Sequence, residues 1–237
     1  MRVPRLEGII ERRILLNYRV APEFASPLLP KPFRPKLQNG YAMAGLCLIR
    51  LGAVRPKGFP AAVGLRSENA AHRVAVEWTE DGVMKDGVFI LRRETSSRFN
   101  ALVGGRLFPG FHHRAKFAVN ENAGRYDVAF SSDDGTHAHL QATLSESWNE
   151  ESVFGSLTEA SEFFKRGNNG FSPGTNQLDG MCLTTRNWQV RSLNVHSVRS
   201  TFYDDTTLFP KGNIELDDAL LMTNLEHEWQ SIEAPHN

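Results

Sequence analysis

Short apolar runs separated by turn residues fill most of this sequence, and that pattern constrains the fold more than any other feature. The runs are rich in Val, Ile, Leu, Phe and Tyr, and Pro, Gly or Asp-Gly breaks divide them. The pattern predicts strands over residues 6–20, 41–54, 62–78, 87–92, 111–119, 126–131, 137–144, 180–190 and 193–203. Many strands with few helices are typical of a β-barrel or a strongly curved antiparallel sheet.

Helix signals are few. The best helix covers residues 157–166, where Ser156 and Glu159 have capping-box spacing and Gly167 closes the last turn. Shorter helices are predicted over residues 21–30, 95–103 and 216–221. We therefore expect one amphipathic helix to cover part of the sheet.

The charge balance limits the partners. Lys and Arg together number 27, as do Asp and Glu, so the net charge at pH 7 is zero. No net positive field draws the chain to nucleic acid or to an acidic membrane surface, and we expect neither partner. Several arginines nevertheless lie within apolar stretches, namely Arg50, Arg55, Arg73, Arg92, Arg93 and Arg106. A guanidinium there meets either a carboxylate of the protein or a ligand anion.

The cysteines and the N-terminus favour a cytoplasmic protein. Cys47 and Cys182 lie far apart in short apolar runs, which favours buried, reduced thiols in a reducing compartment. The first residues alternate charged and apolar types too often for a signal peptide, and no apolar run is long enough to span a membrane. We expect a single cytoplasmic domain over residues 1–237.

The densest cluster of polar side chains lies in the segment 104–117. Its glycines and proline permit close backbone approach, which would place Arg, His and Lys side chains at the mouth of a cavity. If a strand begins here, alternation puts His112, Arg114 and Lys116 on one face and His113 on the other. Either one of these side chains faces a ligand, or the glycine pairs merely end a helix and start a strand.

A second polar run interrupts the predicted strand 62–78. It contains Glu68, His72 and Arg73, and polar groups in a core strand must be hydrogen-bonded, ion-paired or facing a water-filled pocket. The run therefore forms either a salt-bridge network or part of a site.

The sequence offers histidines for a metal site but no complete metal or cofactor motif. His137 and His139 share a face of a predicted strand and could join His112 or His113 around a metal. No acidic or Cys ligand falls at a suitable spacing nearby, so we expect no metal. The sequence has no Gly-rich phosphate loop, GxSxG, HExxH or CxxC motif, and we expect no cofactor.

A set of motifs along the chain together resembles one family. The motifs are Asn17-Tyr18-Arg19-Val20, Glu68-Asn69-Ala70-Ala71-His72-Arg73, Arg93-Glu94-Thr95-Ser96-Ser97, Gly104-Gly105-Arg106-Leu107-Phe108-Pro109-Gly110, His112-His113 and Phe154-Gly155-Ser156-Leu157. The set resembles the YqjF-like family, grouped with acetoacetate decarboxylase-like proteins, over residues 8–222. The resemblance implies a predominantly β domain of the α+β class. A curved antiparallel sheet or β-barrel would surround a central cavity, with a few short helices.

The resemblance also bears on the chemistry. In acetoacetate decarboxylases a lysine of the segment GFPKK forms a Schiff base with the keto acid. Here His112, His113 and Arg114 stand where that family has Pro, Lys and Lys, so the amine is missing. Lys116 lies two residues further along, and could replace the lysine only if the register of the strand differs.

Further site residues follow from the same resemblance. It places Glu68 near a pocket carboxylate of the decarboxylases, and Arg19 near the arginine that would receive the substrate carboxylate. We predict catalytic roles for His113, Lys116 and Glu68, and substrate-binding roles for Arg19, His72, Arg106, His112 and Arg114. Such a site suits a small carboxylate or carbonyl compound, because arginine forks hold the anion while a histidine moves a proton.

Two functions remain open at this point. One is an enzyme of lyase or hydratase type that acts on a small oxo or hydroxy acid without the usual Schiff-base lysine. The alternative is a non-catalytic carrier or sensor of the same class of molecule. The sequence does not decide between them, and the resemblance leaves room for a homo-oligomer.

Overall fold

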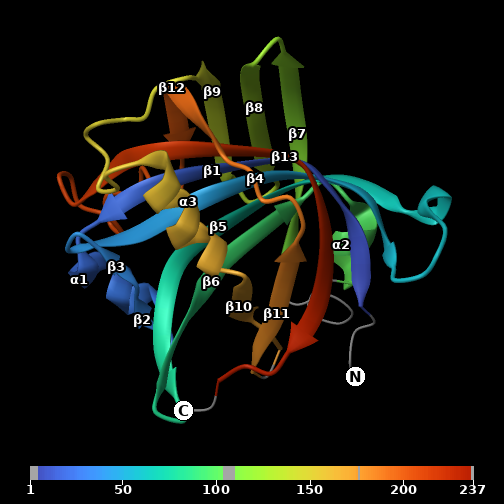
Figure 1. Cartoon of the computed structure of the whole chain (residues 1–237), viewed down its shortest axis with the longest axis horizontal. Helices are drawn as coiled ribbons and strands as arrows, with labels where there is room; N and C mark the ends of the chain where they lie inside the picture. The colour runs from blue at the N-terminus through green and yellow to red at the C-terminus, as the bar shows by residue number, and fades with distance from the viewer. Residues whose placement is uncertain (1–4, 104–109, 176, 236–237) are drawn as a thin grey trace.

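A computed structural model describes residues 5–103, 110–175 and 177–235 of the chain, and a 13-stranded sheet dominates it (Figure 1). The elements are β1 (Leu6–Val20), α1 (Pro22–Ala25), η1 (Ser26–Leu28), β2 (Arg34–Pro35), β3 (Leu37–Gln38), β4 (Tyr41–Pro56), η2 (Ala61–Val63), β5 (Leu65–Glu80), β6 (Val83–Thr95), α2 (Arg98–Val103), β7 (His112–Asn122), β8 (Arg125–Ser132), β9 (His137–Ser145), α3 (Leu157–Arg166), β10 (Asn169–Pro173), β11 (Leu178–Thr185), β12 (Arg191–Ser200) and β13 (Ile214–Ile232). Within these ranges no helix is long and apolar enough to cross a membrane.

Strand pairing closes part of this sheet into a ring. Going round it, β1 pairs with β4, β4 with β5, β5 with β6, β6 with β10, β10 with β11, β11 with β13, and β13 again with β1. The predicted curved sheet around a central space is confirmed. The sheet is mixed, however, because β6 pairs in parallel with both β10 and β7.

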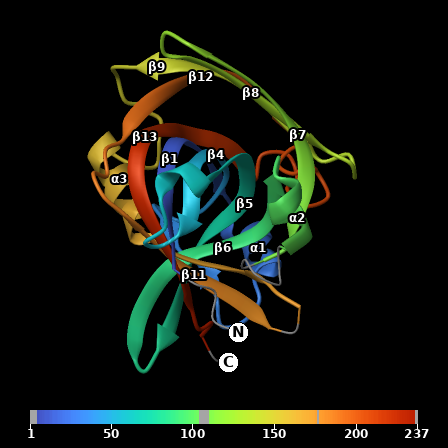
Figure 2. The same ribbon diagram turned by 90° about the vertical axis from the view of Figure 1, so that its right-hand side faces the viewer.

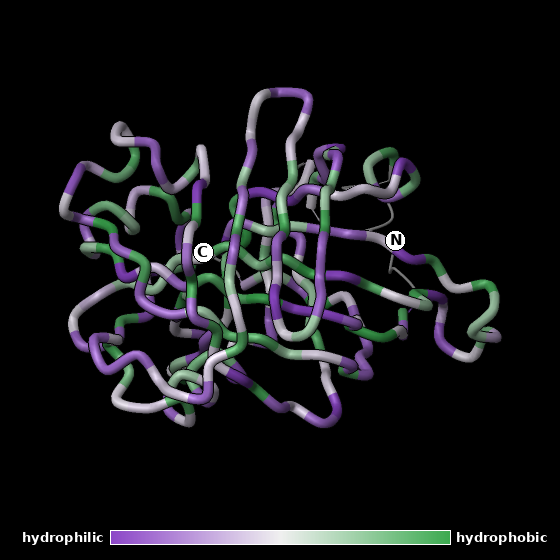
Figure 3. Tube along the Cα trace, turned by 90° about the horizontal axis from the view of Figure 1, so that it is seen from above, coloured by the Kyte–Doolittle hydropathy of each residue, from purple (hydrophilic) through white to green (hydrophobic). Residues whose placement is uncertain are grey.

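The strands β7, β8, β9 and β12 form an arch over one side of the ring (Figure 2). A large cluster of buried apolar side chains fills the space between them, with Phe130 and Leu140 from the arch and Leu46 and Val74 from the ring. Seen from above, hydrophilic and hydrophobic residues interchange along these strands (Figure 3). That pattern is expected of strands with one face on a core.

Side chains of the ring strands point alternately in two directions. One set lies on the arch face, which points toward the arch, and the other on the cavity face, which points into the ring. On β5, Ala70 and Val74 belong to the cluster under the arch, whereas Ala75 belongs to a second apolar cluster on the opposite face. The helix α3 packs on that second cluster through Ala160 and Phe164.

The helix α3 has the predicted bounds because its end signals are local. Ser156 Oγ accepts a hydrogen bond from the Glu159 amide at 3.2 Å, and the Glu159 carboxylate accepts one from the Gly155 amide at 2.8 Å. The cap therefore satisfies backbone donors at the start of the helix, as its sequence predicts.

The predicted helix over residues 216–221 is wrong, since β13 runs through this segment. Leu220 packs in the cluster beside α3, and Leu221 packs in the cluster under the arch. Both faces of the strand are buried here, including Asp217 and Asp218, and the sequence is apolar without a break from Ala219 to Met222. The segment therefore lacks the alternation that marks a half-exposed strand.

Candidate functional site

A cavity of about 440 Å³ lies inside the ring, and every ring strand contributes to its wall. The apolar side chains that line it include Leu6, Cys47, Ile49, Leu51, Ala71, Val88, Ile90, Met181, Leu183 and Trp229. The volume lies within the range of small-molecule sites, which are mostly apolar with a few well-placed polar groups. Such polar groups are present at one end, where α2 and the start of β7 meet the ring.

Arg93 is the central polar residue of this end. Its side chain extends from the cavity face of β6 and is only 7% exposed. Nη1 donates a hydrogen bond to Ser172 Oγ, whereas Nη2 has no hydrogen-bond partner among the described residues. Burial lowers the pKa of Arg93 to about 10, and the carboxylate of Asp179 opposes this shift. The guanidinium therefore keeps its charge at neutral pH and has one donor without a partner among the described residues.

His112 lies beside Arg93 because the two residues are direct partners in the parallel pairing of β6 with β7. Its Nδ1 lies 3.1 Å from the Gly110 carbonyl oxygen. A carbonyl only accepts, so Nδ1 carries the proton of that bond and Nε2 is left as an acceptor. Burial and the positive charge of Arg93 lower the pKa of His112 to about 3. The imidazole is therefore neutral at pH 7.

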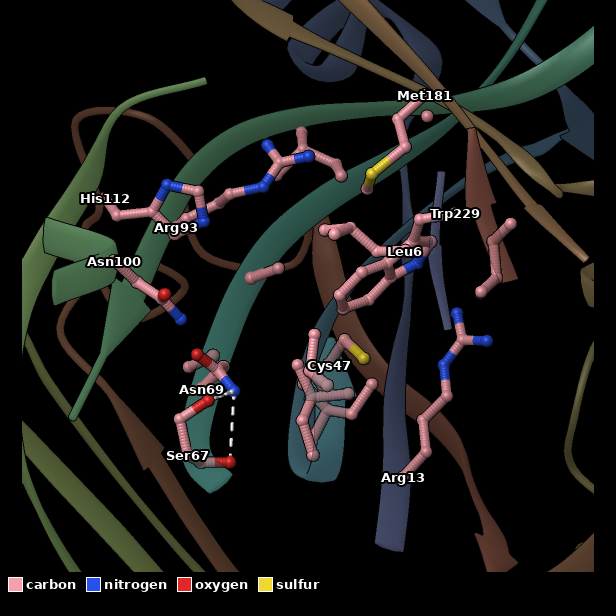
Figure 4. A pocket seen from close by; sticks show the side chains of 18 of the residues that line it. Leu6, Arg13, Cys47, Ser67, Asn69, Arg93, Asn100, His112, Met181 and Trp229 are labelled. Atoms are coloured by element: carbon pink, nitrogen blue, oxygen red, sulfur yellow. Dashed lines mark hydrogen bonds between the residues drawn. The ribbon is translucent and has the colours of Figure 1, made fainter. Parts of the chain in front are cut away.

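Two asparagines extend the polar end (Figure 4). The Asn69 amide donates to Ser67 Oγ at 2.9 Å, and its carbonyl oxygen accepts from Thr95 Oγ1 at 2.8 Å. Asn100, on α2, also lines the cavity. The close-up places His112, Arg93 and Asn100 toward one side and Arg13 and Trp229 toward the other.

Ion pairs account for most of the other arginines in apolar stretches. Arg55 lines the cavity but is held by Glu7 at 2.9 Å, and Arg92 pairs with Glu94 and with Asp134 on the arch face. Among the described residues that line the cavity, Arg93 and Arg13 have no carboxylate in ion-pair contact. The guanidinium of Arg13 lies 6.0 Å from the ring of Trp188.

Of the predicted site residues within the described ranges, only His112 lines the cavity. Glu68 lies elsewhere, in a charge network in which Arg12 Nη2 is 2.7 Å from Glu68 and Arg12 Nη1 is 2.7 Å from Glu121. Arg50 contacts both carboxylates as well. The polar run on β5 was expected to form either a salt-bridge network or part of a site. Glu68 belongs to a salt-bridge network.

His72 is completely buried on the arch face. Its ring lies 4.6 Å from that of Phe202, and its Nε2 is 3.7 Å from Glu94 Oε2. Burial, followed by the charge of Arg92, lowers the pKa of His72 to about 3, while burial raises the pKa of Glu94 to about 7. His72 is therefore not among the described residues that line the cavity, whereas Glu94 is.

The remaining predicted residues are dispersed. His113, Arg114 and Lys116 are exposed along β7, and Arg19 pairs with Glu215 at 3.0 Å. Arg106 lies outside the described residues. The groups that define the polar end were therefore missed, except for His112. Arg93 was identified only as one of several arginines in apolar runs and as the first residue of the motif Arg93-Glu94-Thr95-Ser96-Ser97, and no site role was predicted for it.

No group of three or more His, Cys, Asp or Glu in the described ranges is arranged to hold a metal ion. The cavity also lacks a lysine among its described lining residues. The segments outside the description, residues 1–4, 104–109, 176 and 236–237, contain no lysine either. The described wall of the cavity therefore lacks the lysine amine that a Schiff base requires.

Several solved structures share this fold at low sequence identity. Acetoacetate decarboxylase from Legionella pneumophila superposes with a TM-score of 0.65 at 12% identity, covering 98% of this chain and 88% of that one. An acetoacetate decarboxylase-like enzyme from Sphingomonas wittichii RW1 gives 0.57 at 12%, covering 97% and 93%. The enduracididine biosynthesis enzyme MppR, complexed with pyruvate, gives 0.57 at 11%, covering 96% and 87%.

No curated protein matches the chain. The model of the DUF2071 family, described as an uncharacterized conserved protein, matches residues 10–216. That match spans most of the ring and the arch. The chain therefore belongs to the DUF2071 family and has the fold of the acetoacetate decarboxylase-like proteins.

Proposed function

We propose that this protein binds a small organic carboxylate inside the ring of strands, with Arg93 as the anchor. The observation that carries the proposal is the buried guanidinium of Arg93, which lines the cavity and has an Nη2 donor without a partner in the described structure. Leaving such a donor unpaired is costly, and a carboxylate oxygen satisfies it through a charge-assisted hydrogen bond.

The neighbouring imidazole supports the same class of ligand. His112 is neutral and offers Nε2 as an acceptor, so it suits a hydroxyl, an enol or an acidic C–H beside the bound carboxylate. In MppR, a protein of similar fold, a structure holds pyruvate, which is a small oxo acid. A small oxo or hydroxy acid is therefore the first class of ligand to test.

The same geometry supports a second candidate function, proton transfer on the bound acid. His112 would accept a proton from the carbon or oxygen next to the carboxylate and return it at another position, as in an isomerase or a dehydration. A pKa of about 3 makes His112 a weak base in the free protein. A bound carboxylate would raise that pKa, because the nearby negative charge favours the imidazolium. Without such a rise the site is that of a carrier or sensor.

Calorimetric titration with pyruvate, lactate and other small oxo and hydroxy acids tests the proposal. Arg93→Met removes the charge at similar length, and we expect it to weaken binding by about tenfold or more. Arg125→Met is the matched control, since Arg125 is exposed on the arch, and it should bind as the unchanged chain does. Equal affinity of the Arg93→Met variant and the unchanged chain would refute Arg93 as the anchor. Proton exchange of the acid with solvent deuterium, followed by NMR, distinguishes an enzyme from a carrier.

A further inference from the structure

The cavity is larger and more apolar than a small oxo acid requires. Its volume of about 440 Å³ equals the liquid volume of roughly 15 water molecules. Beyond the polar end, the wall is built from Ile49, Val88, Ile90, Met181 and Trp229. An acid of pyruvate size would occupy the polar end alone and leave most of this apolar wall without contacts. A ligand that fills the cavity must therefore be largely apolar.

The apolar wall continues to the molecular surface. Val63, Leu65 and Phe99 all line the cavity, yet they are 58%, 50% and 49% exposed. Val63 belongs to η2, Leu65 starts β5 and Phe99 lies on α2. In Figure 1 the cyan segment that leads into β5 lies on the same right-hand side of the molecule as α2. Apolar side chains gathered at the mouth of a cavity are typical of a binding groove.

Two lining arginines have no carboxylate in ion-pair contact among the described residues, namely Arg93 at the polar end and Arg13 on the other side of the cavity, and Arg93 is the one at the polar end. Arg55 is held by Glu7, and the Glu94 carboxylate is held by Arg92 on the arch face. Within the described parts of the chain, Arg93 has a donor without a partner at the buried polar end. A single negative charge can therefore be bound at depth, with an uncharged chain between it and the surface.

We propose that the occupant is an amphipathic monocarboxylate, whose carboxylate binds Arg93 and whose apolar chain runs along the cavity toward Val63, Leu65 and Phe99. This inference rests on the proposed function, since it uses Arg93 as the carboxylate anchor. It adds the size and polarity of the remainder of the molecule, which is an aliphatic chain or an aryl-alkyl group of several carbons.

Titration of the intact chain with straight-chain carboxylates from acetate to dodecanoate tests the inference. We expect the dissociation constant to fall about fourfold per added methylene, which is about 0.8 kcal/mol, until the cavity is full, and then to level off. The matched primary alcohols should bind about tenfold more weakly or worse, because they lack the charge that Arg93 binds.

A double variant tests the path of the chain. Val63→Ser with Leu65→Ser should weaken binding of the longer acids by about tenfold, while the short acids bind as before. Val83→Ser with Leu37→Ser is the matched control, because these residues are 60% and 48% exposed and do not line the cavity. All four positions are exposed, so both proteins should fold, which circular dichroism verifies.

The outcomes separate this inference from the function on which it rests. If short oxo acids bind in an Arg93-dependent manner and longer chains bring no gain, the amphipathic ligand is refuted and the proposed function stands. If no carboxylate of any length binds, the amphipathic ligand and the proposed function are both refuted. If dicarboxylates bind at least tenfold more tightly than monocarboxylates and lose that advantage in Arg13→Met, the apolar end of the ligand is refuted.

Discussion

Arg93 and His112 are direct neighbours across the parallel pairing of β6 with β7, and both line the cavity. The charge of Arg93, acting together with burial, keeps His112 neutral. One residue thus supplies a fixed positive charge and the other a neutral acceptor. In the proposed function, that combination would bind an acid without adding a second charge to be desolvated.

The first prediction concerns this pair. Replacing Arg93 with Met should raise the pKa of His112 above its present value of about 3, because a nearby positive charge that disfavours the imidazolium is removed. Burial still acts, so the value should stay below 6.5. NMR titration of the His112 ring protons measures it. No change in the pKa would show that burial alone sets it.

The second prediction concerns acid stability. Burial lowers the pKa of His72, His112 and His227 to between about 3 and 4. Between these values and 6.5 the unfolded chain binds more protons than the folded chain, so stability is full above 6.5 and is lost as the pH falls. We expect a loss of about 1 to 2 kcal/mol per histidine from pH 7 to pH 5, measured by urea unfolding.

A pair of variants checks the source of this acid effect. His72→Phe should make the loss of stability between pH 7 and pH 5 smaller, since one buried histidine no longer titrates. His196→Phe alters an exposed histidine of β12 and should leave the pH dependence unchanged. Identical profiles for both variants would contradict the assignment to buried histidines.

The third prediction concerns Glu94, whose effect on stability changes with pH in the direction opposite to that of the histidines. Burial raises the pKa of Glu94 to about 7, so the folded chain binds the extra proton. This contribution is full below 4.5 and is lost as the pH rises through 7. In the unchanged chain it offsets part of the histidine effect. Glu94→Gln should therefore lose stability more steeply than the unchanged chain from pH 7 to pH 5, and a shallower profile would count against the raised pKa.

The fourth prediction concerns Arg12, whose side chain is only 2% exposed between Glu68 and Glu121. Arg12→Met leaves two partly buried carboxylates with Arg50 as their remaining partner. Because Arg50 still compensates them, we expect a loss of about 2 kcal/mol of unfolding free energy. Ligand affinity should not change if the network is structural. Loss of binding without loss of stability would instead return Glu68 to the site.

The fifth prediction concerns closure of the ring. A Cβ on Gly180 would lie 2.7 Å from the Ile232 backbone oxygen, where β11 pairs with β13. Gly180→Ala should therefore cost about 2 kcal/mol of unfolding free energy. On the adjacent strand β10, a Cβ on Gly170 would meet Ile90 Cδ1 at an ordinary 3.4 Å. Gly170→Ala is the matched control and should cost less than half as much.

Local signals predicted what depends on neighbours in sequence. The bounds of α3 were predicted correctly because Ser156, Glu159 and Gly167 mark its ends, and β9 of the arch was predicted because its residues alternate clearly. Local sequence signals could not predict that the ring closes, because β11 pairs with β13 and β10 pairs with β6 across long separations in sequence. The strand β13 was mistaken for a helix because both of its faces are buried.

The site was harder to predict for a related reason. Arg92 and Arg93 are adjacent and chemically identical, and alternation sends one to each face of β6. A register shift between His72 and Arg73, in the pairing of β5 with β6, further changes which residues lie opposite one another. Which arginine faces the cavity therefore depends on strand register, which no single-sequence pattern fixes.

Arg92 and Arg93 lie on opposite faces of β6 and therefore differ in what their replacement would change. Arg92 is paired with Glu94 and Asp134, so its replacement would leave the buried Glu94 carboxylate without its arginine partner. Arg93 contacts one serine hydroxyl and otherwise faces the cavity. In the proposed function, substitutions on the cavity side of β6 would change the ligand, while the other side of the strand preserves the fold. A single strand would thus stabilise the fold through one face and bind the ligand through the other.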